Sequence, residues 1–232
     1  MIPPRGQPTH GPYGDSASRL IDISMSLGTS SMIWPGHPPF ELRPFKRLSD
    51  GHDTEVSELR MSTHSGTHVD APRHILAGAA GSDSIDLESL VGEATVIDCT
   101  DVDDEITPAH LERHGPMSPR ALLKTQSSRL RPGDPFPERW AALTPAAAQW
   151  LVGRGVRLVG TDFLSIEPPT STEKRVHRIL IEGGVAILEN LRLAHVSPGP
   201  YELICLPIRL VDADGVPARA ILRVRSEHHP PG

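Results

Sequence analysis

Apolar and polar residues follow one another along the chain in a pattern that predicts more strands than helices. Alternation at Leu20–Leu27 and Glu55–Ser62 predicts two half-buried strands. Short continuous apolar runs predict buried strands, and these lie at Ala94–Cys99, Val156–Gly160, Val185–Leu188, Leu203–Ile208 and Ala220–Val224. This set favours a single α/β domain with a substantial mixed sheet.

Helix signals are fewer but locally clear. Thr107-Pro108 opens one predicted helix and Thr144-Pro145 opens another, and a glycine follows each. Threonine suits the N-cap, proline the first turn and glycine the end of a helix. A third, shorter helix is predicted over Glu173–Leu180.

Proline and glycine mark the remaining segments as loops. Residues 1–18 predict a flexible N-terminal arm and residues 227–232 a C-terminal tail, so the folded domain is expected over 19–226. The run from Trp34 to Pro39 predicts an ordered loop that carries one large aromatic side chain. Arg129–Arg139 predicts a surface loop and a candidate lid.

Composition narrows the class of protein. The 232 residues include 24 prolines and 20 glycines, are 38% apolar and carry a net charge of −6 without a basic block, which argues against a nucleic-acid partner. No apolar run approaches the roughly 20 residues of a membrane span, and we expect a cytoplasmic protein. Cys99 and Cys205 lie in apolar runs, where buried free thiols are expected.

The residues that suggest chemistry gather between positions 64 and 74. In an extended chain, side chains repeat with period two, so His64, Gly66, His68 and Asp70 would share one face. Gly66 would then leave room for an ion between the two histidines. Imidazole and carboxylate ligands suit zinc, manganese or iron. The alternative is a hydrogen-bond network within a loop.

His74 and Trp34 are candidates for the reaction and for substrate binding. His74 lies beyond Pro72 and could approach an ion without ligating it. An unperturbed histidine titrates near pH 6.5 and can both take and give a proton, so we predict a general acid/base. Trp34 would offer a flat wall to an aromatic substrate, with ordinary core packing as the alternative.

The sequence around two residues in the second half of the chain does not by itself assign them a role. Glu189 follows the apolar run Val185–Leu188 and is either a paired or metal-bound carboxylate or an exposed strand-end residue. The sequence around His177 by itself favours a histidine on the surface of a helix.

The run from His64 to His74, His-Ser-Gly-Thr-His-Val-Asp-Ala-Pro-Arg-His, resembles the signature of the cyclase family that contains bacterial kynurenine formamidases and isatin hydrolases. The likeness extends from about Leu20 to about Arg225. Further matching segments are Trp34-Pro35-Gly36, Gly155–Asp162, Ala186–Leu191, Tyr201–Pro207 and Asp214-Gly215. One departure is His37, where the family often has aspartate.

The resemblance implies a swivelling β/β/α-type fold and a homodimer or homotetramer. It also implies that Trp34 lines the substrate pocket and that His74 is the general acid/base. The implied metal ligands are His64, His68 and Asp70, with His177 and Glu189 completing a second metal position.

We therefore expect a hydrolase that uses one or two divalent ions, zinc or manganese, and a small-molecule substrate. Metal-activated water would cleave the C–N bond of an aryl formamide, such as N-formylkynurenine, or of a cyclic amide. One alternative is a lactam or lactone hydrolase or cyclase similar to isatin hydrolase. A further alternative is a non-catalytic metal-binding protein.

Overall fold

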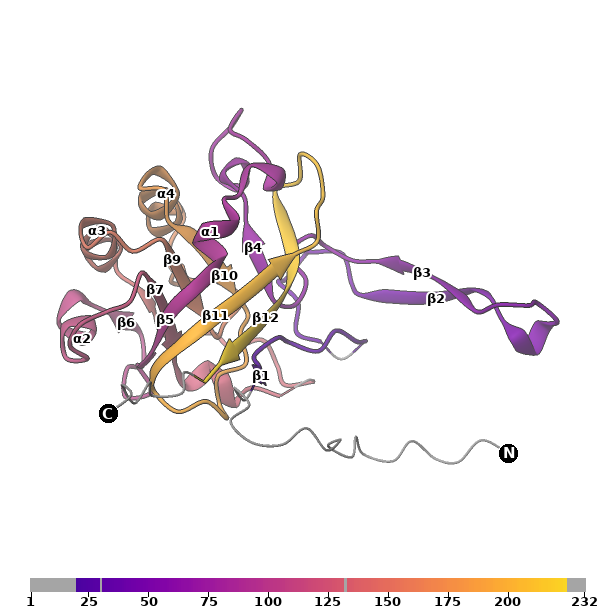
Figure 1. Ribbon diagram of the computed structural model, residues 1–232, viewed down its shortest axis with the longest axis horizontal. Coiled ribbons are helices and arrows are strands. Elements are labelled where there is room, and N and C mark those ends of the chain that lie inside the picture. Colours follow the sequence, from indigo (N-terminus) through magenta and orange to yellow (C-terminus); the bar gives the residue numbers. More distant parts are fainter. Residues whose placement is uncertain (1–19, 30, 132, 225–232) are drawn as a thin grey trace, which may run out of the picture.

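The computed structural model describes residues 20–29, 31–131 and 133–224. The predicted arm at 1–18 and tail at 227–232 lie outside these residues. The body is an eight-stranded mixed sheet in the order β1-β12-β11-β5-β7-β9-β10-β4 (Figure 1). Its strands are β1 Leu20–Asp22, β4 His68–Asp70, β5 Val91–Asp98, β7 Arg120–Lys124, β9 Leu158–Thr161, β10 Ala186–Glu189, β11 Gly199–Pro207 and β12 Gly215–Arg223.

Strand β4 closes this sheet into a barrel-like ring. It pairs antiparallel with β10 on one side and with β12 on the other, although it is three residues long. The run β5-β7-β9-β10 is parallel, whereas β11 and β12 pair antiparallel with their neighbours. The expected α/β class with a mixed sheet is confirmed.

Three helices cover the parallel strands, and successive side chains of these strands divide between two cores. The helices are α2 Pro108–Glu112, α3 Pro145–Gly153 and α4 Arg175–Glu182, and they lie together on one side of the sheet (Figure 1). Val159 and Ile187 pack on the helix side, whereas Leu158 and Leu188 fill the ring. A short helix, α1 Leu87–Leu90, leads directly into β5.

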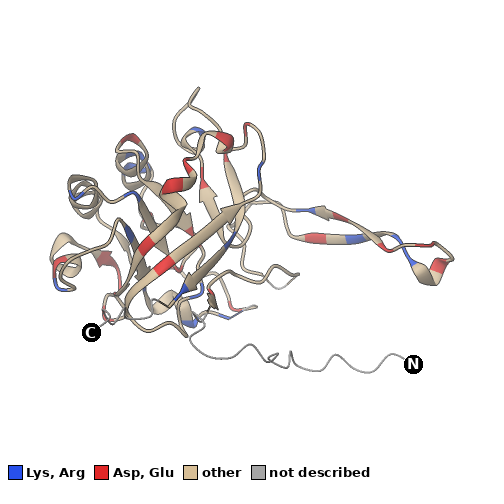
Figure 2. Ribbon diagram, viewed as in Figure 1, with Lys and Arg blue, Asp and Glu red and all other residues tan. Residues whose placement is uncertain are grey.

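A two-stranded hairpin, β2 Glu41–Lys46 and β3 Val56–Arg60, projects away from this body (Figure 1). Both of its strands carry basic and acidic residues (Figure 2). Glu55–Ser62 was predicted to be a half-buried strand, and that burial is wrong: every residue of β3 is exposed. Alternation defines the apolar face of a strand, but it does not say whether another element covers that face.

Other predictions hold with shifted ends. The three predicted helices are present, and the expected strand at Leu20–Leu27 ends at Asp22. Strand β7 was missed because only three apolar residues lie between its basic ends, and the pair β6 Glu105–Ile106 and β8 Ala142–Leu143 is too short to show a period. Both cysteines are free and buried, and no described helix is long and apolar enough to cross a membrane.

Candidate metal centre

The closing strand β4 carries two of the predicted ligands on one face. Val69 points into the core of the ring, so its neighbours His68 and Asp70 point to the opposite, helix-covered face. Register pairs His68 with Glu189 on β10. Helix α4 packs against β10 and brings His177 to the same place.

His64 joins this cluster by a different route from the one predicted. The expected continuous extended segment is wrong for residues 64–67, which form a turn rather than a strand. Gly66 has a φ of +66°, and a Cβ atom there would lie 2.6 Å from Cδ2 of Leu27. Glycine is therefore needed for the turn and for close packing, and the turn brings the His64 ring to 4.9 Å from the His68 ring.

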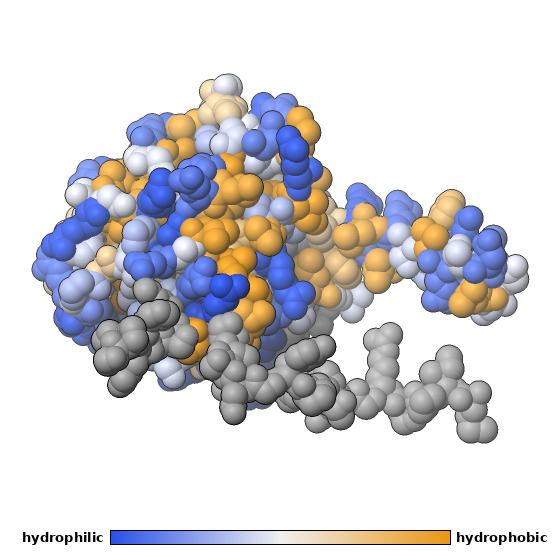
Figure 3. Space-filling view, viewed as in Figure 1, coloured by the Kyte–Doolittle hydropathy of each residue, from blue (hydrophilic) through white to orange (hydrophobic). Residues whose placement is uncertain are grey.

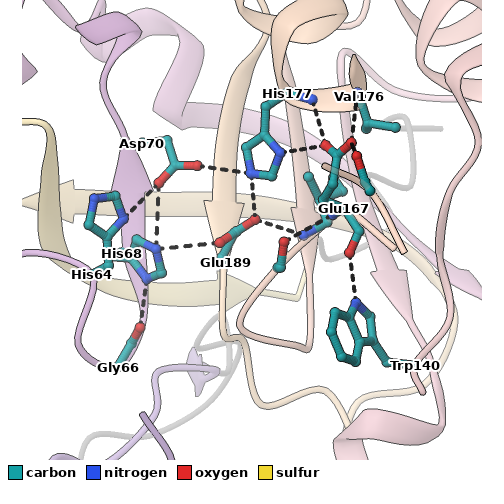
Figure 4. A network of polar contacts seen from close by, with 12 residues as sticks. His64, Gly66, His68, Asp70, Trp140, Glu167, Val176, His177 and Glu189 are labelled. Carbon is teal, nitrogen blue, oxygen red and sulfur yellow. Dashed lines mark hydrogen bonds and ion pairs between the residues drawn. The ribbon is translucent and has the colours of Figure 1, made fainter. Parts of the chain in front are cut away.

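Two carboxylates link the histidines, as the dashed contacts in Figure 4 show. Asp70 Oδ1 lies 3.1 Å from His64 Nδ1 and 3.5 Å from His68 Nε2, while Asp70 Oδ2 lies 3.5 Å from His177 Nε2. Glu189 spans the same gap, with Oε2 at 3.5 Å from His68 Nε2 and Oε1 at 3.3 Å from His177 Nε2. The five predicted ligand residues therefore form one cluster.

Several of these polar atoms are buried without hydrogen-bond partners among the described residues. They are Nε2 of His64, Nε2 of His68 and both carboxylate oxygens of Asp70. Burying such groups unsatisfied is costly, whereas bound divalent cations would satisfy them. The ligand atoms of these three residues also lie within 4.8 Å of one another. The donor set therefore fits a divalent metal better than a loop hydrogen-bond network.

Glu167 orients His177, and it was not among the site residues predicted from the sequence. Its Oε2 lies 2.6 Å from His177 Nδ1, and its two oxygens accept hydrogen bonds from the backbone N–H groups of Val176 and His177 (Figure 4). This contact holds Nδ1 as the donor and leaves Nε2 facing the cluster. His177 is 2% exposed, so the alternative of a helix-surface histidine is wrong. Glu167 precedes two prolines in a loop, and nothing in that pattern signals a buried carboxylate.

These contacts shift the protonation of both partners in the absence of an ion. Burial opposes ionisation of both Glu167 and His177, but the hydrogen bond between them outweighs this effect. The pKa of Glu167 falls to about 2, and the pKa of His177 rises to about 10, with Glu189 contributing to the latter. Burial also opposes ionisation of Asp70, but the close contact with His64 Nδ1 and the charges of nearby histidines lower its pKa.

His74 lies beside the cluster, in a short 3-10 turn that begins at Pro72. Its ring centre is 4.2 Å from that of His64 and 6.0 Å from that of His177. Burial lowers the pKa of His74, and this effect outweighs the opposing charge of Asp70. The neutral imidazole is therefore available to take a proton at neutral pH.

A pocket opens from these groups, and Trp34 forms part of its wall. The Trp34 ring packs edge-on against Phe136 at 5.4 Å and Trp140 at 5.9 Å. Trp34 thus lies both in the pocket wall and at the edge of an aromatic cluster. The two alternatives weighed for it, substrate wall and core packing, therefore do not exclude each other. Phe136 lies in the predicted 129–139 loop, which anchors that loop beside the pocket. His37 and Lys174 also line the pocket. The sequence indicated His37 only as a departure from the family in the substrate loop, and it did not indicate Lys174.

Comparisons with known proteins agree with this geometry. The family model described as Putative cyclase matches residues 21–168. The chain belongs to this cyclase family. The kynurenine formamidase of Salinibacter ruber is 39% identical over 206 residues, which cover 88% of this chain and 97% of the relative. The kynurenine formamidase of Bacillus cereus is 37% identical over 210 residues, with 89% and 98% covered.

Solved structures with the same fold include a metal-dependent hydrolase and an isatin hydrolase. A potential metal-dependent hydrolase with cyclase activity is 30% identical, covers 90% of this chain and all of its own, and superposes with a TM-score of 0.79. Isatin hydrolase A from Labrenzia aggregata, bound to benzyl benzoate, has a TM-score of 0.79 at 24% identity, with 89% and 93% covered. The cyclase-type fold expected from the sequence is confirmed.

Proposed function

We propose that this member of the cyclase family is a metal-dependent amidohydrolase that cleaves the C–N bond of an aryl formamide, such as N-formylkynurenine. The observation that carries the proposal is the set of buried, unpartnered nitrogen and carboxylate atoms at the base of a pocket walled by Trp34. Relatives named kynurenine formamidase, similar over nearly their whole length, support the substrate class.

The proposed ligands divide into two groups that share a carboxylate. His64, His68 and Asp70 would hold one ion, and His177 with Glu189 would complete a second position on the other side of Asp70. Borderline-hard nitrogen and oxygen donors suit zinc or manganese. A bound ion of this kind lowers the pKa of water toward about 7 and polarises a carbonyl oxygen.

The chain's own residues would bind the substrate and move the proton. Trp34 offers its ring face to the aryl group and thereby orients the formamide toward the ligand cluster. His74 accepts a proton from the attacking water and returns it to the nitrogen as the C–N bond breaks. The products are the aryl amine and formate, so one water is consumed and no oxidant is needed.

Formate release from N-formylkynurenine tests this function. Protein stripped with a chelator should be inactive, and addition of zinc or manganese should restore turnover. A fully metallated protein that releases no formate from any of several aryl formamides would contradict the proposal.

A second candidate keeps the same centre and changes the substrate to a lactam or lactone. The observation that favours it is the shared fold with isatin hydrolase A over 89% of this chain. Turnover of isatin-like or lactone substrates, with aryl formamides inert, would select this candidate. Metal uptake with no turnover of either class would instead favour a non-catalytic metal-binding protein.

We also propose that the chain forms a homodimer, or a homotetramer built from such dimers, through the β2–β3 hairpin. An isolated two-stranded hairpin is marginally stable in water, and this one exposes 59% of Leu42, 70% of Phe45 and 51% of Leu59. Apolar surface is visible along it in Figure 3. A second copy of the chain would bury these side chains.

Light scattering coupled to gel filtration tests the assembly. The double variant Phe45→Glu, Leu59→Lys should elute as a monomer, because it places charges in the proposed contact. Leu87→Glu, at a 60% exposed leucine on α1, is the matched control and should keep the wild-type mass. A wild-type monomer at micromolar concentration would contradict the proposal.

A cytoplasmic location is proposed as well. Two free cysteines, Cys99 and Cys205, support it, since a reducing compartment preserves thiols. Cell fractionation tests it, and recovery with the membrane or secreted fraction would contradict it.

A further inference from the structure

Lys174 departs from three local rules at the start of helix α4. Its backbone is left-handed, with φ 51° and ψ 43°, a conformation that residues other than glycine seldom adopt. It occupies the N-cap position, where serine, threonine, aspartate or asparagine is preferred, and its side chain makes no cap hydrogen bond. It also places a cation at the positive end of the helix dipole. Such departures gather at functional sites.

Glu167 explains why lysine is tolerated there. Its carboxylate accepts the backbone N–H groups of Val176 and His177 at 3.2 Å and 3.1 Å, so the helix end is already capped by another residue. Position 174 is thereby freed from capping. The cap does not explain why the residue is a lysine with a strained backbone.

The side chain of Lys174 supplies that reason, because it turns into the substrate pocket. Its Nζ lies 5.5 Å from the centre of the Trp34 ring, and Lys174 lines the same pocket as His74. It is the single lysine or arginine among the lining residues that the structure describes. None of the ion pairs found between described residues includes Lys174. The ammonium therefore lies over the Trp34 ring at the pocket and forms no ion pair with a carboxylate of the described residues.

We infer that Lys174 is a specificity-determining residue that binds an anionic group, a carboxylate, on the side chain of the aryl formamide substrate. This inference rests on the proposed function. The aryl ring would lie against Trp34 beside the ammonium, with its formamide toward the ligand cluster and its carboxylate toward Nζ. A lysine is a point charge on a flexible stem, so the subsite would accept carboxylates on chains of differing length.

Two substrates that differ in the carboxylate alone test the inference. One is ortho-formamidobutyrophenone, which is neutral, and the other carries a carboxylate in place of the terminal methyl group, so that its acyl chain is an oxobutanoate. For Lys174→Met, kcat/KM on the carboxylate substrate should fall roughly ten- to hundredfold, as expected for a lost charge-assisted hydrogen bond. The neutral substrate should change less than about threefold, so most of the loss is specific to the carboxylate. Lys174→Arg should retain most of the preference.

Arg178→Met is the matched control, because it removes one exposed positive charge from the same helix outside the pocket lining. It should leave both substrates unchanged. Metal content and melting temperature should equal those of the wild type in all three variants. Equal losses on both substrates, or no loss on either, would overturn the role of Lys174.

Titration calorimetry with the amine product of the oxobutanoate substrate tests the carboxylate subsite independently of the proposed hydrolysis. If wild-type protein hydrolyses neither formamide, the proposed function fails. The subsite would still be supported if this carboxylate binds the wild type and Lys174→Met weakens it. Equal affinity of the two proteins for this ligand, or no binding by the wild type, would overturn the subsite.

Discussion

Glu167 shows how much of the centre depends on residues that touch no substrate. It fixes the His177 ring through Nδ1 and caps α4 through two backbone N–H groups. Such partners of metal-binding histidines typically change metal affinity by about 10–100-fold. The position of His177 therefore depends on a loop residue ten positions earlier in the chain.

Glu167→Ala should weaken binding of the ion nearest His177 by roughly 10–100-fold, because the ring loses the contact that orients it. Competition against a chromophoric chelator measures the affinity. Ser171→Ala is the control, since it removes a hydroxyl that donates to Glu167 but leaves the carboxylate in place. Wild-type affinity in Glu167→Ala would show that His177 does not ligate the ion.

His74→Ala should lower kcat by about 10²–10⁴-fold while metal content stays unchanged, because the proton carrier is lost and the ligands remain. The nitrogen atoms of His74 and His177 and an Asp70 oxygen also lie within 4.8 Å of one another, so a ligand role is a distinct outcome. Loss of metal together with activity would identify His74 as a ligand. His37→Ala, which alters the pocket lining, is the control for a general change in the pocket.

At the scale of elements, the turn before β4 and the strand itself position the proposed ligands by different means. Alternation along the sequence correctly placed His68 and Asp70 on one face of an extended strand. It failed for His64, because a left-handed glycine breaks the extension, and backbone conformation leaves no periodic signal. Burial of Glu167 and projection of the β2–β3 hairpin were equally hidden, since both depend on contacts between distant segments. The sheet could be predicted because its apolar runs are local.

Gly66→Ala should destabilise the protein more than Gly78→Ala, although both glycines have positive φ values, +66° and +75°. An added Cβ at Gly66 meets Leu27 Cδ2 at 2.6 Å, whereas nothing lies within 4 Å at Gly78. Overpacking typically costs about 1–3 kcal/mol, and we expect the lower end of this range beyond the shared backbone strain, because the partly exposed Leu27 side chain can move aside. Equal unfolding free energies in urea would contradict the packing role of Gly66.

The edge strand β1 depends on an ion pair that acid should break. Arg219 on β12 donates to both oxygens of Asp22, at 3.0 Å and 2.6 Å. Burial by itself would raise the pKa of Asp22, but these bonds and those from Ser24 lower it. A carboxyl group with a lowered folded-state pKa stabilises the fold above its unfolded pKa of about 3.9 and loses that contribution as pH falls through the folded value.

Asp22→Asn should therefore melt below the wild type at pH 7, and the gap should close as pH drops below about 3.9. The shift should be small, because both side chains are largely exposed to solvent. Melting temperatures of the chelator-treated proteins across this pH range provide the measurement. A gap that persists at low pH would mean that packing, rather than charge, holds β1.

At the scale of the whole molecule, the proposed centre ties together parts of the chain that are far apart in sequence. Strand β4 closes the ring between β10 and β12, and its proposed ligands His68 and Asp70 lie beside Glu189 of β10 and His177 of α4. An ion bound here would bind the folded state in preference to the unfolded chain. Stabilisation then follows from mass action, at about 4 kcal/mol when free metal is 1,000 times its Kd.

Metal removal should accordingly lower the melting temperature, and zinc or manganese should restore it in a concentration-dependent way. Differential scanning calorimetry with a metal titration measures this effect. A melting temperature that does not respond to metal would show that metal binding at the cluster does not stabilise the ring.

The most direct test measures bound metal and formate release in the same samples of purified protein. Elemental analysis should find one or two equivalents of a divalent ion per chain, and hydrolysis of N-formylkynurenine should rise in proportion to that occupancy. His68→Ala should lose both. A folded protein that takes up no divalent ion, or one whose turnover does not depend on it, would contradict the account.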